Sequence, residues 1–157
     1  TVLAGVLKKF GYEVVETTNG AAAWMALHQP DAPSLVILDW MMPEMDGVEV
    51  VRRVRATPTD RAPYLILLTT RGAKADLAAG REAGADDYIT KPFDSSELRA
   101  RVEVGRRVID LQDALAAKVG ELREALDEIE MLREIVAKGA KSTDSSGRPP
   151  SFGAGLE

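Results

Sequence analysis

Residues 35–47 read LVILDWMMPEMDG, and this stretch decides the fold class. Its first four residues are apolar and branched, a pattern typical of a strand buried on both faces of a parallel sheet. Asp39 follows at once and places a carboxylate at the carboxyl end of that strand. Asp46-Gly47 then begins a helix that carries valines inward at three-residue intervals. The stretch therefore predicts a buried strand, an acidic loop and an amphipathic helix in succession.

The same alternation continues on both sides of this stretch. Apolar segments typical of strands are separated by segments with the apolar periodicity of helices. The predicted strands are 12–16, 35–38, 64–68 and 88–90, and the predicted helices are 1–10, 20–27, 47–55 and 75–82. Strands and helices that alternate in this way form right-handed βαβ units. The predicted fold class is therefore α/β, a parallel sheet with helices on both faces.

Composition excludes several classes of protein. The chain has 157 residues, of which 45% are hydrophobic and 29% charged, and this suits one globular domain with an additional segment. Cysteine is absent, which excludes disulfides and thiolate metal sites. No apolar run approaches the roughly 18 residues that span a bilayer, and no signal segment opens the chain, so we expect a cytoplasmic protein without membrane contact. The net charge of −5 argues against a general nucleic-acid-binding surface.

A long helix is predicted from Ser95 to Lys138, because Asp94 or Ser95 can cap it and no proline follows until Pro149. Gly105 is a weak point in it. Beyond residue 108, apolar residues alternate at spacings of four and three, interrupted by Arg133; they are Leu115, Val119, Leu122, Leu126, Ile129 and Val136. This seam of about three heptads predicts a parallel two-stranded coiled coil. In two alternatives, the stripe folds back onto the α/β domain or meets a further domain.

Three predicted strands end in residues that together can handle a phosphoryl group. Asp39, Thr69 and Lys91 each follow a buried strand, and the carboxyl ends of parallel strands meet at one edge of a sheet. A carboxylate can attack phosphorus, a hydroxyl can bond a phosphoryl oxygen, and an ammonium can neutralise the added charge. Taken singly, each residue also has a plain structural interpretation, as a helix cap, a strand-end hydroxyl or a surface charge.

The spacing of these residues resembles that of a known family. DWMMPEMDG at 39–47, LLTT at 67–70 and DYITKPF at 87–93 resemble, in order, the phosphoacceptor loop and the fourth and fifth strands of response-regulator receiver domains. The resemblance covers about residues 1–107. It implies a flavodoxin-like, doubly wound parallel sheet in the order 2-1-3-4-5. It also implies phosphoryl transfer from a sensor histidine kinase or a phosphotransfer protein.

The resemblance assigns a role to each matching residue. Asp39 would be the phosphoacceptor, and Thr69 and Lys91 would bind the phosphoryl group. Asp39 and the Met41 carbonyl would coordinate Mg²⁺. Tyr88 takes the place of the aromatic residue that changes position together with Thr69. The Lys91-Pro92 peptide bond is usually cis in the family.

One departure from the family concerns the metal. The family's first strand ends in an acidic pair that holds Mg²⁺, whereas this sequence begins inside the following helix. We expect roughly 15–20 further residues upstream in the natural protein, enough for the missing first strand and its loop. Mg²⁺ is expected for the complete domain, but binding should be weak or absent in this chain, since Asp39 and one carbonyl are too few ligands.

Two further sets of polar residues are not expected to form sites. Asp86 and Asp87 lie in a loop that leads into a strand, and we interpret them as a solvated turn rather than as substitute metal ligands. His28, the only histidine, lies near a helix end beside Pro30 and is interpreted as a surface or capping residue.

The predicted organisation is a receiver domain at 1–107, a coiled-coil extension at 108–138 that forms a homodimer, and a disordered tail or linker at 139–157. The tail is rich in glycine, serine, proline and charge. The predicted function is a phosphorylation-operated switch that relays its signal through the helix. It would not be an enzyme, beyond self-phosphorylation and loss of its own phosphate.

Two other functions are weighed against the switch. The first is a coiled-coil dimerisation module that carries a degenerate, non-phosphorylated receiver. The second is a DNA-binding regulator, which requires an output domain that this sequence does not contain. The long helix resembles linkers that join receivers to output domains, and such a domain outside this sequence is the partner that this analogy implies.

Overall fold

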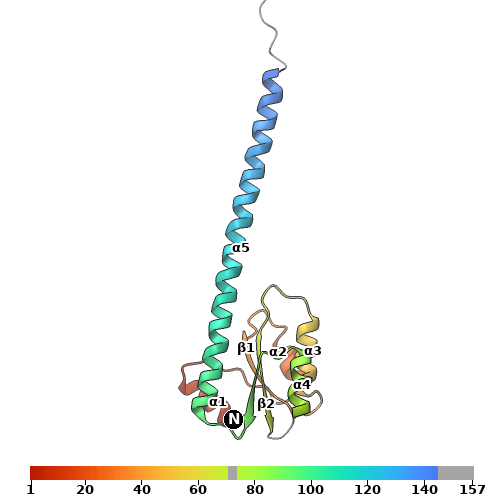
Figure 1. The fold of residues 1–157 in the computed structure, drawn as a ribbon, viewed down its shortest axis with the longest axis vertical. Coiled ribbons are helices and arrows are strands. Elements are labelled where there is room, and N and C mark those ends of the chain that lie inside the picture. Colours follow the sequence, from red (N-terminus) through yellow and green to blue (C-terminus); the bar gives the residue numbers. More distant parts are fainter. Residues whose placement is uncertain (71–73, 145–157) are drawn as a thin grey trace, which may run out of the picture. The chain divides into compact units, whose positions relative to one another are not determined.

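The structure is a computed structural model that describes residues 1–70 and 74–144 (Figure 1). The chain divides into two compact units, Thr1–Asp113 and Ala114–Glu157. The described strands are β1 (Leu35–Asp39), β2 (Tyr64–Thr70) and β3 (Asp87–Lys91). The helices are α1 (Val2–Lys9), α2 (Gly20–Ala26), α3 (Gly47–Ala56), α4 (Lys74–Ala83) and α5 (Ser95–Asp144).

The strands of the first unit form one parallel sheet in the order β1-β2-β3. The central strand, β2, is buried from Tyr64 to Thr69, because it has a neighbour on each side and helices on each face. The predicted α/β class is therefore confirmed. Strands that lie side by side in chain order match the last three strands of the order 2-1-3-4-5.

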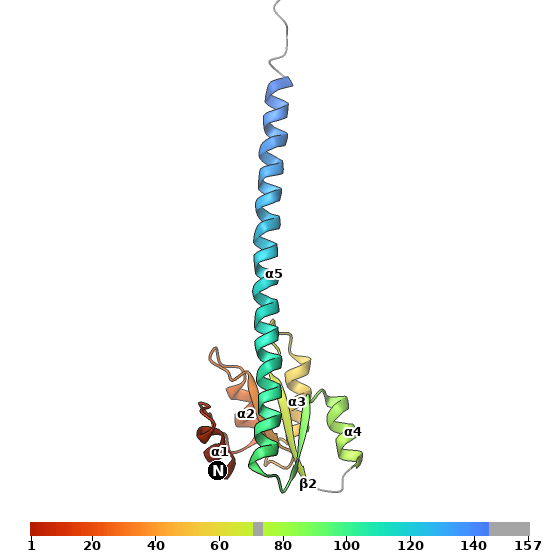
Figure 2. The same cartoon turned by 60° about the vertical axis from the view of Figure 1, so that its left-hand side comes forward.

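Two apolar clusters cover the two faces of this sheet. Leu65 and Leu67 of β2 belong to a cluster with residues of α2, α3 and α4, among them the fully buried Val50 and Val51. Ile66 and Leu68 of β2 point the other way, into a cluster with residues of α1 and α5, whose buried members include Leu7, Leu98 and Val102. Figures 1 and 2 show α5 on one face of the sheet and α3 and α4 on the other. The alternation of side chains along β2 thus supplies both cores.

Gly105 lies where α5 comes close to the sheet. A Cβ atom added there would lie 2.4 Å from Leu35 Cδ1 and 2.7 Å from Tyr64 Cδ1. The sequence identifies this glycine only as a weak point in a helix. In the folded domain it provides the close approach between α5 and the starts of β1 and β2.

Two local predictions are wrong. Residues 12–16 do not form a strand, because no described segment pairs with them and a strand exists only through its ladder of hydrogen bonds. The long helix also continues past residue 138 to Asp144, so residues 139–144 are helical rather than disordered. Alanine and lysine are strong helix formers there, and they outweigh Gly139, which costs about 1 kcal/mol relative to alanine. The rest of the predicted tail lies outside the described residues.

The part of α5 in the second unit carries a row of exposed apolar side chains. Leu115, Leu122, Leu126 and Ile129 are all exposed, although they belong to the predicted heptad seam. Ile129, Leu132, Arg133 and Val136 are among the residues that line a shallow groove along the helix. No helix among the described residues is long and apolar enough to span a membrane.

Candidate functional site

The three predicted site residues lie at one edge of the sheet, where the strands end. Asp39 is the last residue of β1 and Lys91 the last of β3, while Thr69 lies next to the end of β2 between them. The Lys91 ammonium donates a hydrogen bond to Oδ2 of Asp39 and forms an ion pair with it. Parallel pairing thus brings together two residues that are 52 positions apart in the sequence.

Asp39 is accessible as well as paired. Its side chain is 37% exposed and that of Lys91 is 36% exposed, so the carboxylate faces solvent at the edge of the sheet. Its second oxygen, Oδ1, accepts a hydrogen bond from the backbone N–H of Met41 at 3.2 Å. A carboxylate held in this way can act as a nucleophile toward a group that arrives from outside.

The loop after Asp39 is held against the sheet by its backbone. Trp40 N donates to the Leu68 carbonyl at 2.9 Å, and Gly47 N donates to the Trp40 carbonyl at 3.0 Å. A Cβ at position 47 would lie 2.4 Å from the Asp39 carbonyl oxygen, so α3 can begin this close to Asp39 only with glycine there. The sequence marks Gly47 as a helix start, but it does not reveal this contact.

A second glycine holds the far end of the same loop, and sequence reasoning missed it. Gly20 is the first residue of α2, and a Cβ there would lie 1.9 Å from the Met45 carbonyl oxygen. Glu44, one residue earlier in the loop, has a positive φ of 67°. The only sequence signal is that glycine follows Asn19, the cap of α2, where a helix former would otherwise be favourable.

Thr69 and Tyr88, the predicted pair of moving residues, are both turned into the domain. Thr69 is only 5% exposed, and its hydroxyl donates to the Thr70 carbonyl at 3.3 Å rather than to Asp39. The Tyr88 hydroxyl is buried and has no hydrogen-bond partner among the described residues. Burial raises the pKa of the Tyr88 phenol above its ordinary value.

Few residues near Asp39 can act as ligands for Mg²⁺. Among the described residues, no group of three or more Asp, Glu, His or Cys side chains could hold a metal ion. Both oxygens of Asp39 already accept hydrogen bonds, and Met41 is 79% exposed as a residue. A hard cation needs about six oxygen ligands, so these residues do not fit a tight magnesium site. The Lys91-Pro92 peptide bond is cis, as the resemblance implied.

Asp86 and Asp87 are only in part the solvated turn that we expected, because Asp86 is exposed but both carboxylates are paired. Asp86 Oδ2 accepts hydrogen bonds from Arg55 Nη2 at 2.6 Å and from Leu65 N at 2.8 Å. Asp87 pairs with Arg101 of α5 at 3.0 Å. Both aspartates are engaged within the domain, at the end of the sheet opposite Asp39. Their partners are too distant in sequence for a local pattern to indicate them.

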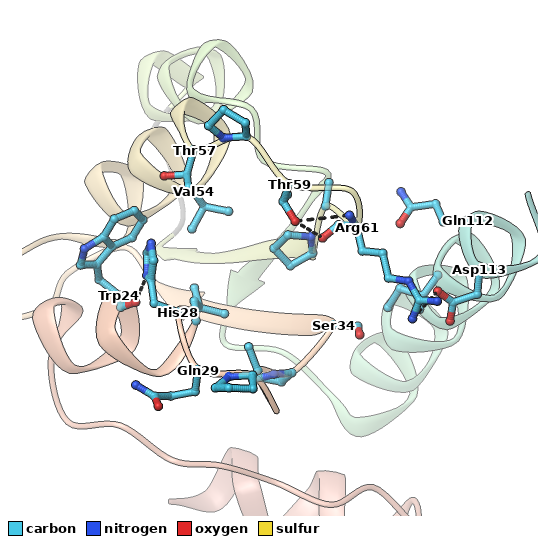
Figure 3. A pocket seen from close by; sticks show the side chains of 18 residues that line it. Trp24, His28, Gln29, Ser34, Val54, Thr57, Thr59, Arg61, Gln112 and Asp113 are labelled. Carbon is cyan, nitrogen blue, oxygen red and sulfur yellow. Dashed lines mark hydrogen bonds and ion pairs between the residues drawn. The ribbon is translucent and has the colours of Figure 1, made fainter. Parts of the chain in front are cut away.

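A separate cavity of about 390 Å³ lies near the amino ends of β1 and β2 (Figure 3). His28 lies in its wall, and Nδ1 of His28 donates to the Trp24 carbonyl at 2.7 Å, with the proton assigned to that nitrogen. This contact at the end of α2 confirms the interpretation of His28 as a capping residue. Arg61 and Asp113, which both line the cavity, form an exposed ion pair of 3.4 Å. The cavity shares no lining residue with the Asp39 site.

Comparison with known proteins agrees with this geometry. The family model described as the response regulator receiver domain matches residues 1–103. The phosphate regulon transcriptional regulatory protein PhoB of Rhizobium meliloti is 45% identical over 98 residues, which cover 62% of this chain and 42% of that protein. Chemotaxis protein CheY1 of Helicobacter pylori is 36% identical over 104 residues, which cover 66% of this chain and 84% of that protein. The chain thus spans less than half of the PhoB relative.

Solved structures agree with the fold. A putative response regulator from Chloroflexus aurantiacus has a TM-score of 0.61 at 36% identity, over 65% of this chain and 83% of that one. The receiver domain of sensor histidine kinase PA1611 from Pseudomonas aeruginosa has a TM-score of 0.59 at 28% identity, over 66% of this chain and 84% of that one. That structure holds a magnesium ion in its active-site cleft. With a matched family model over residues 1–103 and relatives of this similarity, the chain belongs to the response regulator receiver domain family.

Proposed function

We propose that this chain accepts a phosphoryl group on Asp39 from a sensor histidine kinase or a phosphotransfer protein and acts as a switch in two-component signalling. The observation that carries the proposal is the ion pair between Lys91 and the partly exposed Asp39 at the edge of the sheet. A lysine next to a carboxylate that will gain negative charge lowers the cost of that charge.

The chemistry follows from these two groups. An Asp39 carboxylate oxygen attacks the phosphorus of a phosphohistidine, a P–O bond forms, and the P–N bond breaks with the imidazole as leaving group. The Lys91 ammonium then pairs with the phosphoryl oxygens. The chain is an acceptor rather than an enzyme, and its own catalysis is limited to self-phosphorylation from small donors and loss of the phosphate.

The switch itself involves Thr69 and Tyr88. In this proposal the Thr69 hydroxyl leaves the Thr70 carbonyl and bonds a phosphoryl oxygen, which opens space beside the neighbouring strand. Tyr88 lies on that strand with its hydroxyl buried, and the added charge on Asp39 would favour this inward position over an exposed one. The surface formed by β3 and its flanking helices would change shape as a result.

The test is phosphoryl labelling of the complete receiver domain, as wild type and as Asp39→Asn, with acetyl phosphate in buffer that contains Mg²⁺, read by intact mass. Wild type should gain one phosphoryl mass and Asp39→Asn none. Asp46→Asn is the matched control, because Asp46 is a helix cap in the same loop and should leave labelling intact. An adduct on Asp39→Asn equal to that of wild type would show that another residue is the acceptor.

We further propose that residues 108–138 pair with the same segment of a second copy and relay the switch to an output domain outside this sequence. The exposed apolar row on α5 supports pairing, because covering it removes apolar surface from water at about 25 cal/mol per Å². The relatives differ in output, since one is a chemotaxis protein and the other a transcriptional regulator. Membership of the family therefore supports phosphoacceptance, which we place in the cytoplasm. It does not identify an output domain.

The second candidate is a dimerisation module whose receiver is no longer phosphorylated. The thin ligand set around Asp39 favours it, because receiver chemistry relies on a metal. Labelling separates the two candidates. A complete wild-type domain that dimerises but takes no phosphoryl group from acetyl phosphate or from a phosphorylated histidine kinase would support the module and exclude the switch.

A further inference from the structure

Tyr88 lies against a helix position that has no side chain. A Cβ added to Gly80 of α4 would lie 2.8 Å from Cε1 and 3.0 Å from the hydroxyl oxygen of Tyr88. The same atom would lie 3.1 Å from Cδ1 of Leu67, which is fully buried in β2. Tyr88 and Leu67 are partners in the sheet register, so one glycine faces both.

Only one of these neighbours can move easily. Leu67 is packed inside the core, where a shift would disturb several other side chains. Tyr88 is half-buried, and its ring can rotate about χ1 toward solvent. Its hydroxyl gains no hydrogen bond from any described residue in the buried position, so packing of the ring against the apolar cluster, and not a hydrogen bond, holds it there. A methyl group at position 80 would therefore displace the ring rather than the leucine.

Glycine at position 80 lowers helix propensity, and the space that it leaves for the Tyr88 ring explains why it is there. Gly80 lies in the last turn of α4, which ends at Ala83, and alanine is the more favourable helix residue there. Gly5, in α1, shows the contrast, because a Cβ there meets nothing within 4 Å. An alanine at position 80 would thus gain helix propensity and lose the room for Tyr88, whereas an alanine at position 5 would only gain.

We propose that Gly80 is a positioning residue for the switch, because its missing side chain makes the space in which the Tyr88 ring lies inward. A larger residue at this position would hold Tyr88 outward and so fix the switch in one state. The regulatory part rests on the proposed function, in which Tyr88 changes position with the phosphorylation of Asp39. The steric part does not.

The experiment measures the accessibility of Tyr88 in wild type, Gly80→Ala and Gly5→Ala. Each tyrosine is nitrated with tetranitromethane and its rate of modification is followed by peptide mass spectrometry, with buried Tyr64 as the internal reference. If the share of molecules with an outward ring rises from about 10% in wild type to about 90% in Gly80→Ala, Tyr88 should react about ninefold faster in that variant. Gly5→Ala should react like wild type. Unchanged nitration of Tyr88 in a folded Gly80→Ala would overturn the proposal.

A second pair of variants keeps the test decisive if Gly80→Ala folds poorly. In a Tyr88→Ala background the space is free, so Gly80→Ala should raise the melting temperature as Gly5→Ala does. If Gly80→Ala still destabilises that background, its conflict is with Leu67 or the helix, and the proposal is wrong. Phosphorylated wild type separates the two claims. One combined result would exclude the proposed switch and retain the steric role of Gly80. In that result the rate of Tyr88 nitration is the same with and without phosphorylation, but is higher in Gly80→Ala than in wild type.

Discussion

Arg55 and Asp86 form an ion pair of 2.6 Å that joins three backbone segments of the receiver domain. Arg55 also donates to the Gly84 carbonyl at 2.8 Å and to the Pro63 carbonyl at 2.9 Å. Asp86 in turn accepts from the backbone N–H of Leu65 at 2.8 Å. The pair therefore connects the end of α3, the start of β2 and the turn before β3.

Removal of either partner should destabilise the domain. Asp86→Ala removes the charged partner of the half-buried Arg55 guanidinium and the acceptor of the Leu65 N–H, so we expect a loss of roughly 2 kcal/mol of unfolding free energy. Arg55→Ala should cost a similar amount. Urea unfolding of wild type, both single variants and the double variant gives the coupling, expected to be about 1 kcal/mol or more. Additive effects would show that the two residues stabilise the domain independently.

Loss of the Lys91 charge should slow phosphorylation of Asp39. Lys91→Met keeps the length of the side chain but removes the ammonium that pairs with the carboxylate, so the labelling rate should fall by roughly 100-fold. The measurement is the initial rate of phosphoryl incorporation from acetyl phosphate. Lys9→Met, an exposed position at the end of α1, is the control and should label like wild type. Equal rates in Lys91→Met and wild type would remove Lys91 from the site.

Mg²⁺ should bind this chain weakly. Asp39 stands without two further acidic or histidine ligands among the described residues, and a hard cation held by few oxygens dissociates easily. Trp40, directly after Asp39, reports on the site if the other tryptophan is replaced in a Trp24→Phe background. We expect no saturable change of its fluorescence in the low-millimolar range of Mg²⁺. Saturation there, abolished by Asp39→Asn, would contradict the prediction.

The start of α5 should be sensitive to acid through Asp94. Hydrogen bonds donated by the Ser96 hydroxyl and by the Glu97 N–H lower the pKa of Asp94 from its ordinary value of 3.8. A lowered folded pKa means that the stabilisation is complete above pH 3.8 and is lost as the pH falls through the lower, folded value.

The corresponding variants are Asp94→Ala and Asp94→Asn. Asp94→Ala should lower the melting temperature at pH 7, and its difference from wild type should shrink below pH 3.8. Asp94→Asn keeps a neutral cap and should show a smaller loss at neutral pH. Melting curves by circular dichroism between pH 2 and pH 7 check both expectations. A difference for Asp94→Ala that does not vary with pH would assign the effect to the helix sequence rather than to the carboxylate.

The exposed seam of α5 should form a dimer. Leu122→Glu with Ile129→Glu places charge in the seam, whereas Ala117→Glu with Met131→Glu places the same charge on the opposite side of the heptad. In chains that end at Asp144, wild type and the control pair should sediment as dimers, and the seam variant as a monomer. A wild type that is monomeric at tens of micromolar would end the dimer proposal.

The orientation of the two helices can be tested separately, because the chain has no cysteine. In a parallel pair, position 122 of one copy faces position 122 of the other, so Leu122→Cys should form a disulfide between copies under mild oxidation. An antiparallel pair places the two positions apart. A dimer by sedimentation that does not cross-link at position 122 would replace the parallel arrangement with the antiparallel one.

Local pattern was enough to predict most elements and the identity of the site residues. The apolar runs at 35–38 and 64–68 predicted β1 and β2 as strands. Only β2 is buried along nearly its whole length, whereas β1 lies at the edge of the described sheet and is mostly half-buried. The order of Asp39, Thr69 and Lys91 at strand ends predicted that all three would meet at one edge of the sheet. The prediction of a strand at residues 12–16 was wrong, because a strand depends on a neighbouring strand that its own sequence does not specify.

By itself, the sequence determined the fold class, the family and the residues at the ends of the strands, since these follow from periodicity and from short motifs. Only the tertiary structure decided which of them touch. In the tertiary structure Lys91 pairs with Asp39, and Arg55 pairs with Asp86. Gly105 lies against β1, and Gly80 lies against Tyr88. A glycine in a helix lowers helix propensity by the same amount whether it faces solvent or an aromatic ring. A charged residue looks the same in the sequence whether it is solvated or paired in the folded protein. Both differences are set by the packing of segments far apart in the chain, which local sequence does not encode.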